Sequence, residues 1–235
     1  MKILAPFAGP VSFPLLVYKH EKQPDLELIN SCTSAEVNGD VILDSITNLS
    51  KMPHITFYKI VGGVYITMYS LVGNLESDVI YTVKEGTLAD YNARLYALKT
   101  AKKKVINVDP QTAVENALKN NYLALVGNEV RVDVLLDEEF KRLGIYTPQC
   151  LIAVKDSADV KSIIDMYEEG IRLIKMDYEK ASQIIVSSSS YYSLDIMRQI
   201  IRLYNHRLTT RKEDLEKAIE VYSLVEPKVK RLRLI

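Results

Sequence analysis

The order of strand-like and helix-like segments constrains the fold of this chain more than any single motif. Within the first 45 residues, strand-like segments at 2–6, 26–30 and 41–43 alternate with a helix at 13–21 and a short helical turn, which the capping pattern at 33–36 opens. This alternation is typical of a parallel sheet with right-handed crossovers. Segment 41–43 is wholly apolar, which predicts a strand covered on both faces.

The order changes further along the chain. Segments 55–61 and 64–71 are rich in β-branched and aromatic residues and flank Gly62-Gly63, which predicts a β-hairpin. A second run of alternating strands and helices extends over 78–154. The last third has no strand pattern and predicts helices at 158–178, 194–205 and 211–224, with a serine loop at 187–190. Helices that bring no new strand must pack on a sheet already formed, so we expect the chain to return to the first unit.

The pattern therefore predicts an α/β protein with two lobes, each a mostly parallel sheet flanked by helices. We expect residues 1–77 to form the first part of lobe one and 78–154 to form lobe two. Residues 155–235 would return to lobe one and supply the C-terminal helices. A chain of 235 residues with 48% apolar residues can bury two modest cores. Segments 71–80 and 149–155 would cross between the lobes and act as the hinge.

Charge and apolar runs limit the partners and the compartment. The 30 basic and 30 acidic residues cancel, so no broad nucleic-acid surface is predicted. The basic tail 228–233 fits either a solvated terminus or a contact with a partner or membrane surface. Only residues 3–5 form an apolar run before Pro6, too short for a secretory signal, and no run approaches a membrane span. We therefore expect a cytoplasmic protein with no transmembrane segment, and an extracytoplasmic one only if a leader was removed.

Classical catalytic and metal motifs are absent from the sequence. Histidines 20, 54 and 206 have no metal-ligand spacing with cysteines or carboxylates, so no metal and no cofactor is predicted. There is no glycine-rich phosphate loop and no Gly-x-Ser-x-Gly elbow. Cys32 and Cys150 are either free thiols or a single bridge.

In open parallel sheets, ligands bind beyond the carboxyl ends of the strands, beside helix N-termini. By this rule the candidate ligand-binding residues of the first lobe are Gly9, Pro10, Ser12, Phe13, Ser31, Thr33, Ser34, Asp44 and Ser45. Those of the second lobe are Glu85, Gly86, Thr87, Asp109, Asn128, Glu129 and Arg131. In addition, one of Tyr65, Tyr69 and Tyr81 is placed to reach the cleft.

These loops favour an anionic ligand but leave alternatives open. Free N–H groups near Ser12 and Phe13, hydroxyl side chains and Arg131 would suit a carboxylate, phosphate or similar oxyanion. A neutral polar ligand such as a sugar or nucleoside is also compatible. Some candidates have simpler roles, because Thr33, Ser34 and Thr87 can cap helices and Gly9 and Gly86 can turn the chain. Asp44, Glu85 and Glu129 would serve as general acids or bases only if desolvated, and no catalytic residue is assigned.

Four segments carry a resemblance to a known family. The stretches 8–15, 37–41, 83–87 and 120–127 resemble the strand-to-helix segments around the cleft of type II periplasmic (solute) binding proteins. With no visible leader, the chain is most similar to uncharacterised archaeal members of that superfamily. The resemblance spans residues 1 to about 205. It implies a two-lobed fold in which the chain crosses between the lobes and back, with the ligand between them.

The resemblance implies a function but leaves alternatives. The first is non-catalytic binding of a small, polar, anionic metabolite, with a transporter as partner if the protein is exported. The second is a cytoplasmic lyase or synthase acting on a small carboxylated metabolite, like the menaquinone or thiamine-precursor biosynthetic members. The third, which rests on the residues and not on the resemblance, is an interaction module such as a homodimer that uses the tyrosine-rich helical third as its surface. The alternative for the same tyrosines is a place in the core. The tyrosines concerned are Tyr167, Tyr178, Tyr191, Tyr192, Tyr204 and Tyr222.

Overall fold

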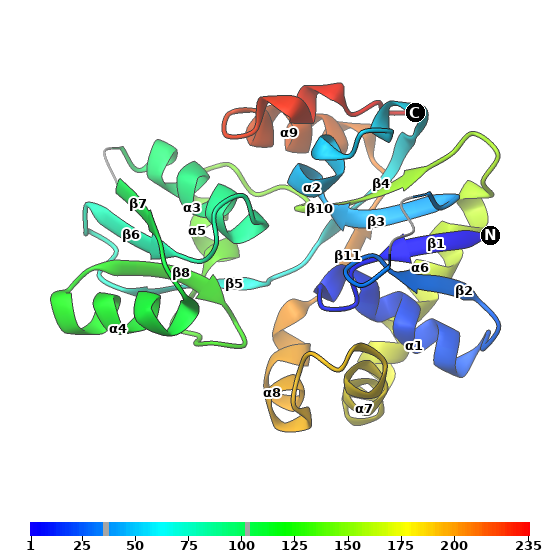
Figure 1. Ribbon diagram of the computed structural model, residues 1–235, viewed down its shortest axis with the longest axis horizontal. Coiled ribbons are helices and arrows are strands. Elements are labelled where there is room, and N and C mark those ends of the chain that lie inside the picture. The colour runs from blue at the N-terminus through cyan, green and yellow to red at the C-terminus, as the bar shows by residue number, and fades with distance from the viewer. Residues whose placement is uncertain (35–37, 102–103) are drawn as a thin grey trace.

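The computed structural model describes residues 1–34, 38–101 and 104–235, which form one six-stranded and one five-stranded sheet (Figure 1). The six-stranded sheet, in lobe one, contains β1 (Lys2–Ala5), β2 (Glu27–Asn30), β3 (Val41–Ser45), β4 (Lys59–Tyr65), β10 (Cys150–Val154) and β11 (Arg207–Thr209). The five-stranded sheet, in lobe two, contains β5 (Tyr69–Gly73), β6 (Val79–Thr82), β7 (Lys104–Asn107), β8 (Leu123–Gly127) and β9 (Val134–Leu135).

Most strands in each sheet run in one direction. In lobe one the order is β11-β4-β10-β3-β1-β2, with β1 parallel to β2 and β3. Strand β10 is antiparallel to β3 and β4, and β11 is antiparallel to β4. In lobe two the order is β7-β6-β8-β5-β9, and only β5 runs against its neighbours. The predicted two-lobed α/β architecture is therefore confirmed.

Helices cover both sheets. In lobe one they are α1 (Phe13–Glu21), α2 (Ile46–Lys51), α6 (Val160–Met176), α7 (Tyr178–Ser189), α8 (Leu194–Tyr204) and α9 (Lys212–Ser223). The short 3₁₀ segments η1 (Pro10–Ser12), η2 (Ile55–Phe57) and η3 (Pro227–Arg231) also belong to this lobe. Lobe two carries α3 (Leu88–Lys99), α4 (Pro110–Asn120) and α5 (Leu136–Arg142). The C-terminal α9 and η3 pack against α2, so the last helices return to lobe one as expected.

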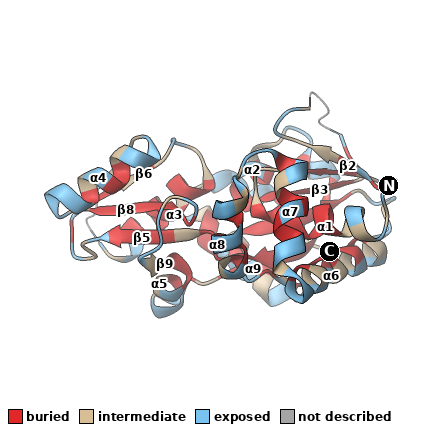
Figure 2. Ribbon diagram, turned by 90° about the horizontal axis from the view of Figure 1, so that it is seen from below, coloured by how far each residue is buried: buried red, intermediate tan, exposed pale blue. Residues whose placement is uncertain are grey.

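The core follows the two-residue period of the strands. In β8, Leu123 and Leu125 point into the main core with α3, while Ala124 and Val126 point to the opposite face and pack with α4. Buried residues accordingly run along the strands of both sheets, as Figure 2 shows. Within residues 1–34, 38–101 and 104–235, no helix is long and apolar enough to cross a membrane.

The described chain passes between the two sheets at residues 66–68, which join β4 to β5, and at 145–149, which lead into β10. The second crossing lies close to the predicted segment 149–155. The first lies before the predicted segment 71–80, because Tyr69 already belongs to the five-stranded sheet. Lobe two therefore begins before residue 77, where the sequence pattern placed the end of the first segment.

The hairpin predicted at Gly62-Gly63 is wrong. Strand β4 runs straight through both glycines and pairs with β10. A Cβ atom on Gly63 would lie 2.8 Å from Pro148 and 2.9 Å from Leu215, so this glycine allows close packing rather than a turn. Strand β4 also carries a register shift opposite Ile152, which marks a bulge.

Two elements of the last third were missed. Strand β11 adds an edge to the six-stranded sheet where the pattern indicated only helices. The predicted serine loop at 187–190 is largely helical, since α7 extends to Ser189 and ends at Ser190 in the left-handed conformation. Helix α7 begins because the Asp177 side chain accepts a hydrogen bond from Lys180 N. The helical turn predicted at 33–36 involves residues outside the described ranges, which exclude 35–37.

Three of the six tyrosines of the helical third lie in the core, which was the alternative to a dimer surface. Tyr167 is fully buried, and Tyr204 and Tyr222 are each 1% exposed. Tyr191 is the exposed member, at 49%. These side chains therefore stabilise lobe one instead of forming a broad aromatic surface.

Candidate functional site

A cavity of about 320 Å³ lies between the lobes. Among the candidates from the sequence, those that line it are Gly9, Pro10, Asp44, Ser45, Gly86, Thr87 and Glu129. Tyr69, one of the three strand tyrosines expected near the cleft, also lines the cavity. The polar or polarisable lining residues that the sequence did not single out for the site are Asn48, Met68, Cys150, Tyr192 and Tyr204. Each lobe contributes side chains, so the cavity depends on how the lobes face each other.

Ser12 and Phe13 do not line the cavity. Both are buried, and the Phe13 ring packs edge-on against Tyr192 and Tyr204, with ring centroids 5.9 and 5.7 Å apart. The Ser12 N–H donates to Gly9 O at 3.0 Å, and the Phe13 N–H donates to Pro10 O. The donors expected to bind an oxyanion are therefore used inside the turn.

The serine and threonine candidates after β2 lie elsewhere. Ser31 and Ser34 line a separate cavity of about 200 Å³, together with His54 and Tyr58. Thr33 is exposed. The loop at 31–34 does follow the carboxyl end of a parallel strand, as the sequence predicted. The cavity between the lobes, however, does not extend to this loop.

The remaining lobe-two candidates have structural partners. Glu85 is exposed and pairs with Arg94 at 3.5 Å, and Arg131 pairs with Asp133 at 2.9 Å. Asp109 caps α4 by accepting a hydrogen bond from Thr112 N at 3.0 Å. None of these three candidates lines the cavity.

Asn128 is buried and does not line the cavity, but its hydrogen bonds hold the segments beside the cavity in place. Its Nδ2 donates to Thr67 O and its Oδ1 accepts from Ser70 Oγ, both at 2.8 Å. Its backbone N–H donates to Met68 O at 2.9 Å. Asn128 therefore ties the loop that carries Glu129 to the first crossing between the lobes.

Asp44 is the buried acid of lobe one, 9% exposed at the carboxyl end of β3. Its Oδ1 accepts hydrogen bonds from Ser45 N at 2.6 Å and Asn48 Nδ2 at 3.1 Å, and Oδ2 accepts none from the described residues. Burial raises the pKa of Asp44 to about 6, and the bonds from Ser45 and Asn48 offset only part of this effect. Ser45 also caps α2 by accepting from Asn48 N at 3.2 Å.

Glu129 is the corresponding acid of lobe two. Its side chain is open to the solvent in the cleft, but protein atoms on both sides desolvate it and raise its pKa. The carboxylate lies over Gly127, where a Cβ atom would collide with it. Glycine at 127 therefore lets the carboxylate fold back toward the cavity.

Three tyrosines surround these acids. The Tyr192 hydroxyl donates to Ala8 O at 2.6 Å. The Tyr204 hydroxyl is buried beside the Tyr192 hydroxyl, and it makes no hydrogen bond of standard geometry with a described residue. Burial is the main cause that raises the pKa values of the Tyr69 and Tyr204 hydroxyls, and nearby acidic groups, including Glu129, raise them further. Both hydroxyls therefore stay protonated.

Both cysteines are free. Cys32 is exposed, and Cys150 lines the cavity at 3% exposure. Burial and the neighbouring Asp44 raise the pKa of the Cys150 thiol, so it is not a reactive thiolate at neutral pH. In the part of the chain that the structure describes, no three His, Cys, Asp or Glu side chains are placed to hold a metal ion.

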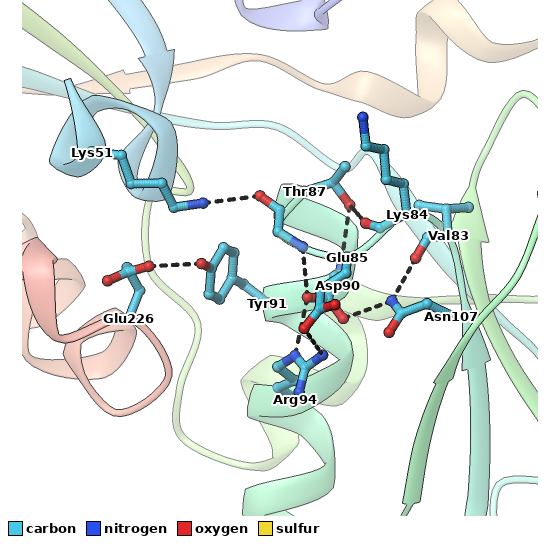
Figure 3. Close-up of polar contacts among 11 residues, drawn as sticks. Lys51, Val83, Lys84, Glu85, Thr87, Asp90, Tyr91, Arg94, Asn107 and Glu226 are labelled. Carbon is cyan, nitrogen blue, oxygen red and sulfur yellow. Dashed lines mark hydrogen bonds and ion pairs between the residues drawn. The ribbon is translucent and has the colours of Figure 1, made fainter.

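Contacts along one rim hold the lobes together, as Figure 3 shows. Lys51 Nζ, from α2, donates to Gly86 O at 3.0 Å and lies 4.5 Å from the centre of the Tyr91 ring. The Tyr91 hydroxyl donates to Glu226 Oε2 at 2.7 Å. Deeper inside, Tyr222 donates to Asn92 Oδ1 at 2.7 Å. The C-terminal segment thus contacts α3 of the opposite lobe.

The Asp90 carboxylate accepts several hydrogen bonds near the N-terminal end of α3. Its Oδ2 accepts from Gly86 N at 2.9 Å and from Arg94 Nε at 3.0 Å, and its Oδ1 accepts from Asn107 Nδ2 at 2.9 Å (Figure 3). Thr87 Oγ1 accepts from Asp90 N at 3.3 Å. The Asp90 carboxylate therefore places a negative charge beside the N-terminal end of this helix.

The family assignment follows from comparison with known sequences. The family model described as "Protein of unknown function (DUF3834)" matches residues 1–207. The chain belongs to this family. No functionally curated protein matches it in sequence.

Solved structures confirm the expected fold. A protein of Thermoplasma volcanium, provisionally called a nitrate transport protein, is 40% identical, with a TM-score of 0.92 over 100% of this chain and 96% of that chain. An ABC transporter protein of Parabacteroides distasonis has a TM-score of 0.69 at 10% identity, with the same coverage. The alkanesulfonate-binding protein SsuA of Xanthomonas axonopodis pv. citri, bound to MOPS, has a TM-score of 0.60 at 10% identity, again over 100% and 96%. This member of the DUF3834 family therefore has the type II solute-binding-protein fold.

Proposed function

We propose that this protein reversibly binds a small organic molecule in the cavity between its lobes. The observation that carries the proposal is a lining drawn from both lobes, with polar groups for which the described residues supply no hydrogen-bond partner. Asp44 Oδ2 and the Tyr204 hydroxyl are examples from lobe one, and Glu129 faces them from lobe two. A volume of about 320 Å³ lies within the range of small-molecule sites.

The proposal includes closure of the lobes around the ligand. The connections at 66–68 and 145–149 are short, and changes in their backbone angles would rotate one lobe against the other. The rim contacts from Lys51 and Tyr91 lie on one side of the cavity and would favour the closed arrangement.

The Thermoplasma volcanium protein and SsuA support ligand binding in general, because their names describe transport and binding. The expectation of an anionic ligand has less support. Among the described residues that line the cavity, none is Lys, Arg or His. The N–H donors near Ser12, Phe13 and Gly86 are already bonded within the protein. A transporter partner and a homodimer remain predictions.

A retention experiment tests the binding proposal. The purified protein would be incubated with a pooled extract of small metabolites, separated by gel filtration and analysed by native mass spectrometry. We expect one retained compound and a smaller radius of gyration in solution scattering. The matched control is Asn48→Trp, because Asn48 is exposed on α2 and lines the cavity, so a large ring there would fill it. Equal retention, or no retention, by both proteins would contradict the proposal.

A second candidate function, lyase or synthase activity, is favoured by one observation. A carboxyl group with a pKa of about 6 can accept or donate a proton near neutral pH, and Asp44 has this property inside the cavity. Conversion of the retained compound by the native protein, lost in Asp44→Asn with retention unchanged, would support catalysis. Release of the compound without chemical change would leave binding alone.

A further inference from the structure

We propose that the ligand of this cavity is an organic amine whose ammonium group contacts the carboxylates of Asp44 and Glu129. The inference rests on the binding function proposed above and adds the chemical class of the ligand. It follows from the charge of the lining, from the hydrogen-bonding groups left open there, and from the size and apolar share of the cavity.

The charge of the lining is negative. Asp44 comes from lobe one and Glu129 from lobe two, and no described lining residue is basic. Both acids and Tyr69 line the same cavity, which places the two carboxylates in one local environment. An anion in this space would be repelled, whereas an ammonium group would neutralise charges that the protein itself leaves unpaired.

Positive groups near the rim are already engaged. The Lys51 ammonium is bonded to Gly86 O and covers the Tyr91 ring. The Asp90 carboxylate accepts from Gly86 N just before α3 and so places a negative charge beside the start of this helix. The turn before α1 uses its own N–H groups, as the bond from Ser12 N to Gly9 O illustrates. These three sets of donors are therefore not available to an oxyanion.

Several of the groups that remain open can accept a hydrogen bond. Asp44 Oδ2 accepts no hydrogen bond from the described residues, although Asp44 is only 9% exposed. The Tyr192 hydroxyl uses its hydrogen on Ala8 O, which leaves its lone pairs available. The Tyr204 hydroxyl, at 1% exposure, has no described partner and also lines the cavity. An ammonium group is a donor with no acceptor, so it matches this set.

The cavity suits an organic cation better than a metal ion. Its volume of about 320 Å³ far exceeds the space of a single ion, and the described residues provide no group of three His, Cys, Asp or Glu ligands. Pro6, Val11, Met68 and Leu88 supply apolar walls for a carbon skeleton. The aromatic rings nearby add favourable contacts with a cation.

Isothermal titration calorimetry with matched probes tests the ligand class. Benzylamine, benzyl alcohol and benzoate share one skeleton, as do hexylamine, hexanol, hexanoate and hexanesulfonate. We expect each amine to bind at least about tenfold more tightly than its alcohol, and each acid to bind more weakly than the alcohol. Asp44→Asn and Glu129→Gln should each lower amine affinity by about tenfold or more and leave alcohol affinity within about twofold. Glu85→Gln, an exposed acid near the rim, is the matched control and should change neither.

Several outcomes would overturn the inference. Tighter binding of an acid than of its matched amine would reject the amine class and leave the binding function standing. Unchanged amine affinity in both Asp44→Asn and Glu129→Gln, or no amine binding at millimolar concentration, would also reject it. In that case, retention of another compound from the metabolite extract would still support the binding function. If Asp44→Asn fails to fold by circular dichroism, the cleft-exposed Glu129→Gln carries the test.

Discussion

Replacing Asp44 with Asn is expected to stabilise the unliganded protein near neutral pH. Burial raises the pKa of this carboxyl group from 3.8 to about 6. Each pKa unit corresponds to about 1.4 kcal/mol of preference for the neutral form, so ionised Asp44 lowers the free energy of unfolding by about 3 kcal/mol at most. Asparagine keeps the oxygen that accepts from Ser45 N and Asn48 Nδ2 and removes the charge.

The sign of the effect depends on pH. Because the folded protein holds the Asp44 proton more tightly than the unfolded chain, the penalty is absent below pH 3.8 and grows until the pH exceeds about 6. Burial raises the pKa values of the Cys150 thiol, the Cys32 thiol and the Tyr69 hydroxyl, which face Asp44, so they stay neutral in this range. The advantage of Asp44→Asn should therefore grow from near zero at about pH 4 to about 2–3 kcal/mol at about pH 8.

Urea unfolding followed by circular dichroism measures this difference. The native protein, Asp44→Asn and the control Glu85→Gln would be compared at about pH 4, 6 and 8. Glu85 is exposed, so its replacement should change the free energy of unfolding by less than about 0.5 kcal/mol at every pH. If Asp44→Asn were less stable than the native protein at about pH 8, the ionised Asp44 carboxylate would have favourable partners within the protein. That result would refute the reasoning that this carboxylate is left unpaired for a ligand.

Three further substitutions give distinct results. Tyr204→Phe removes a buried hydroxyl that has no described partner, so the free energy of unfolding should stay constant or rise by about 1 kcal/mol in urea titrations. Gly170→Ala would push a methyl group into the backbone of Pro14, so the melting temperature should fall, with a loss of about 2 kcal/mol or more. Tyr222→Phe removes the buried bond to Asn92 and should cost about 1–2 kcal/mol and enlarge the radius of gyration in solution scattering.

Elements governed by local chemistry could be predicted from the sequence. The helix expected at 13–21 coincides with α1. Helix α3 begins where Thr87 was expected to cap, because its side chain accepts a hydrogen bond from the N–H of Asp90, three residues ahead. The succession of strands and helices along the chain followed from the alternation of apolar segments and helical patterns. These features depend on neighbours only a few residues apart.

Features that depend on distant residues could not be predicted. The pair at Gly62-Gly63 fits a turn by local rules, but its role is set by Pro148 and Leu215, far away in the sequence. The same limit applies to the cavity. Tyr192 bonds to Ala8 O across 184 positions, so its place in the site follows from how α7 and α8 fold back over α1.

The arrangement of the two acids links ligand choice to lobe closure. Asp44 and Glu129 belong to different lobes, so bringing the lobes together without a ligand concentrates negative charge in a poorly solvated space. The rim bonds from Lys51 and Tyr91 act in the opposite direction and hold the lobes near each other. An ammonium group between the acids would remove the repulsion and leave the rim bonds unopposed. A ligand with this charge therefore stabilises the closed state more than the open one, which is the condition for binding to drive closure.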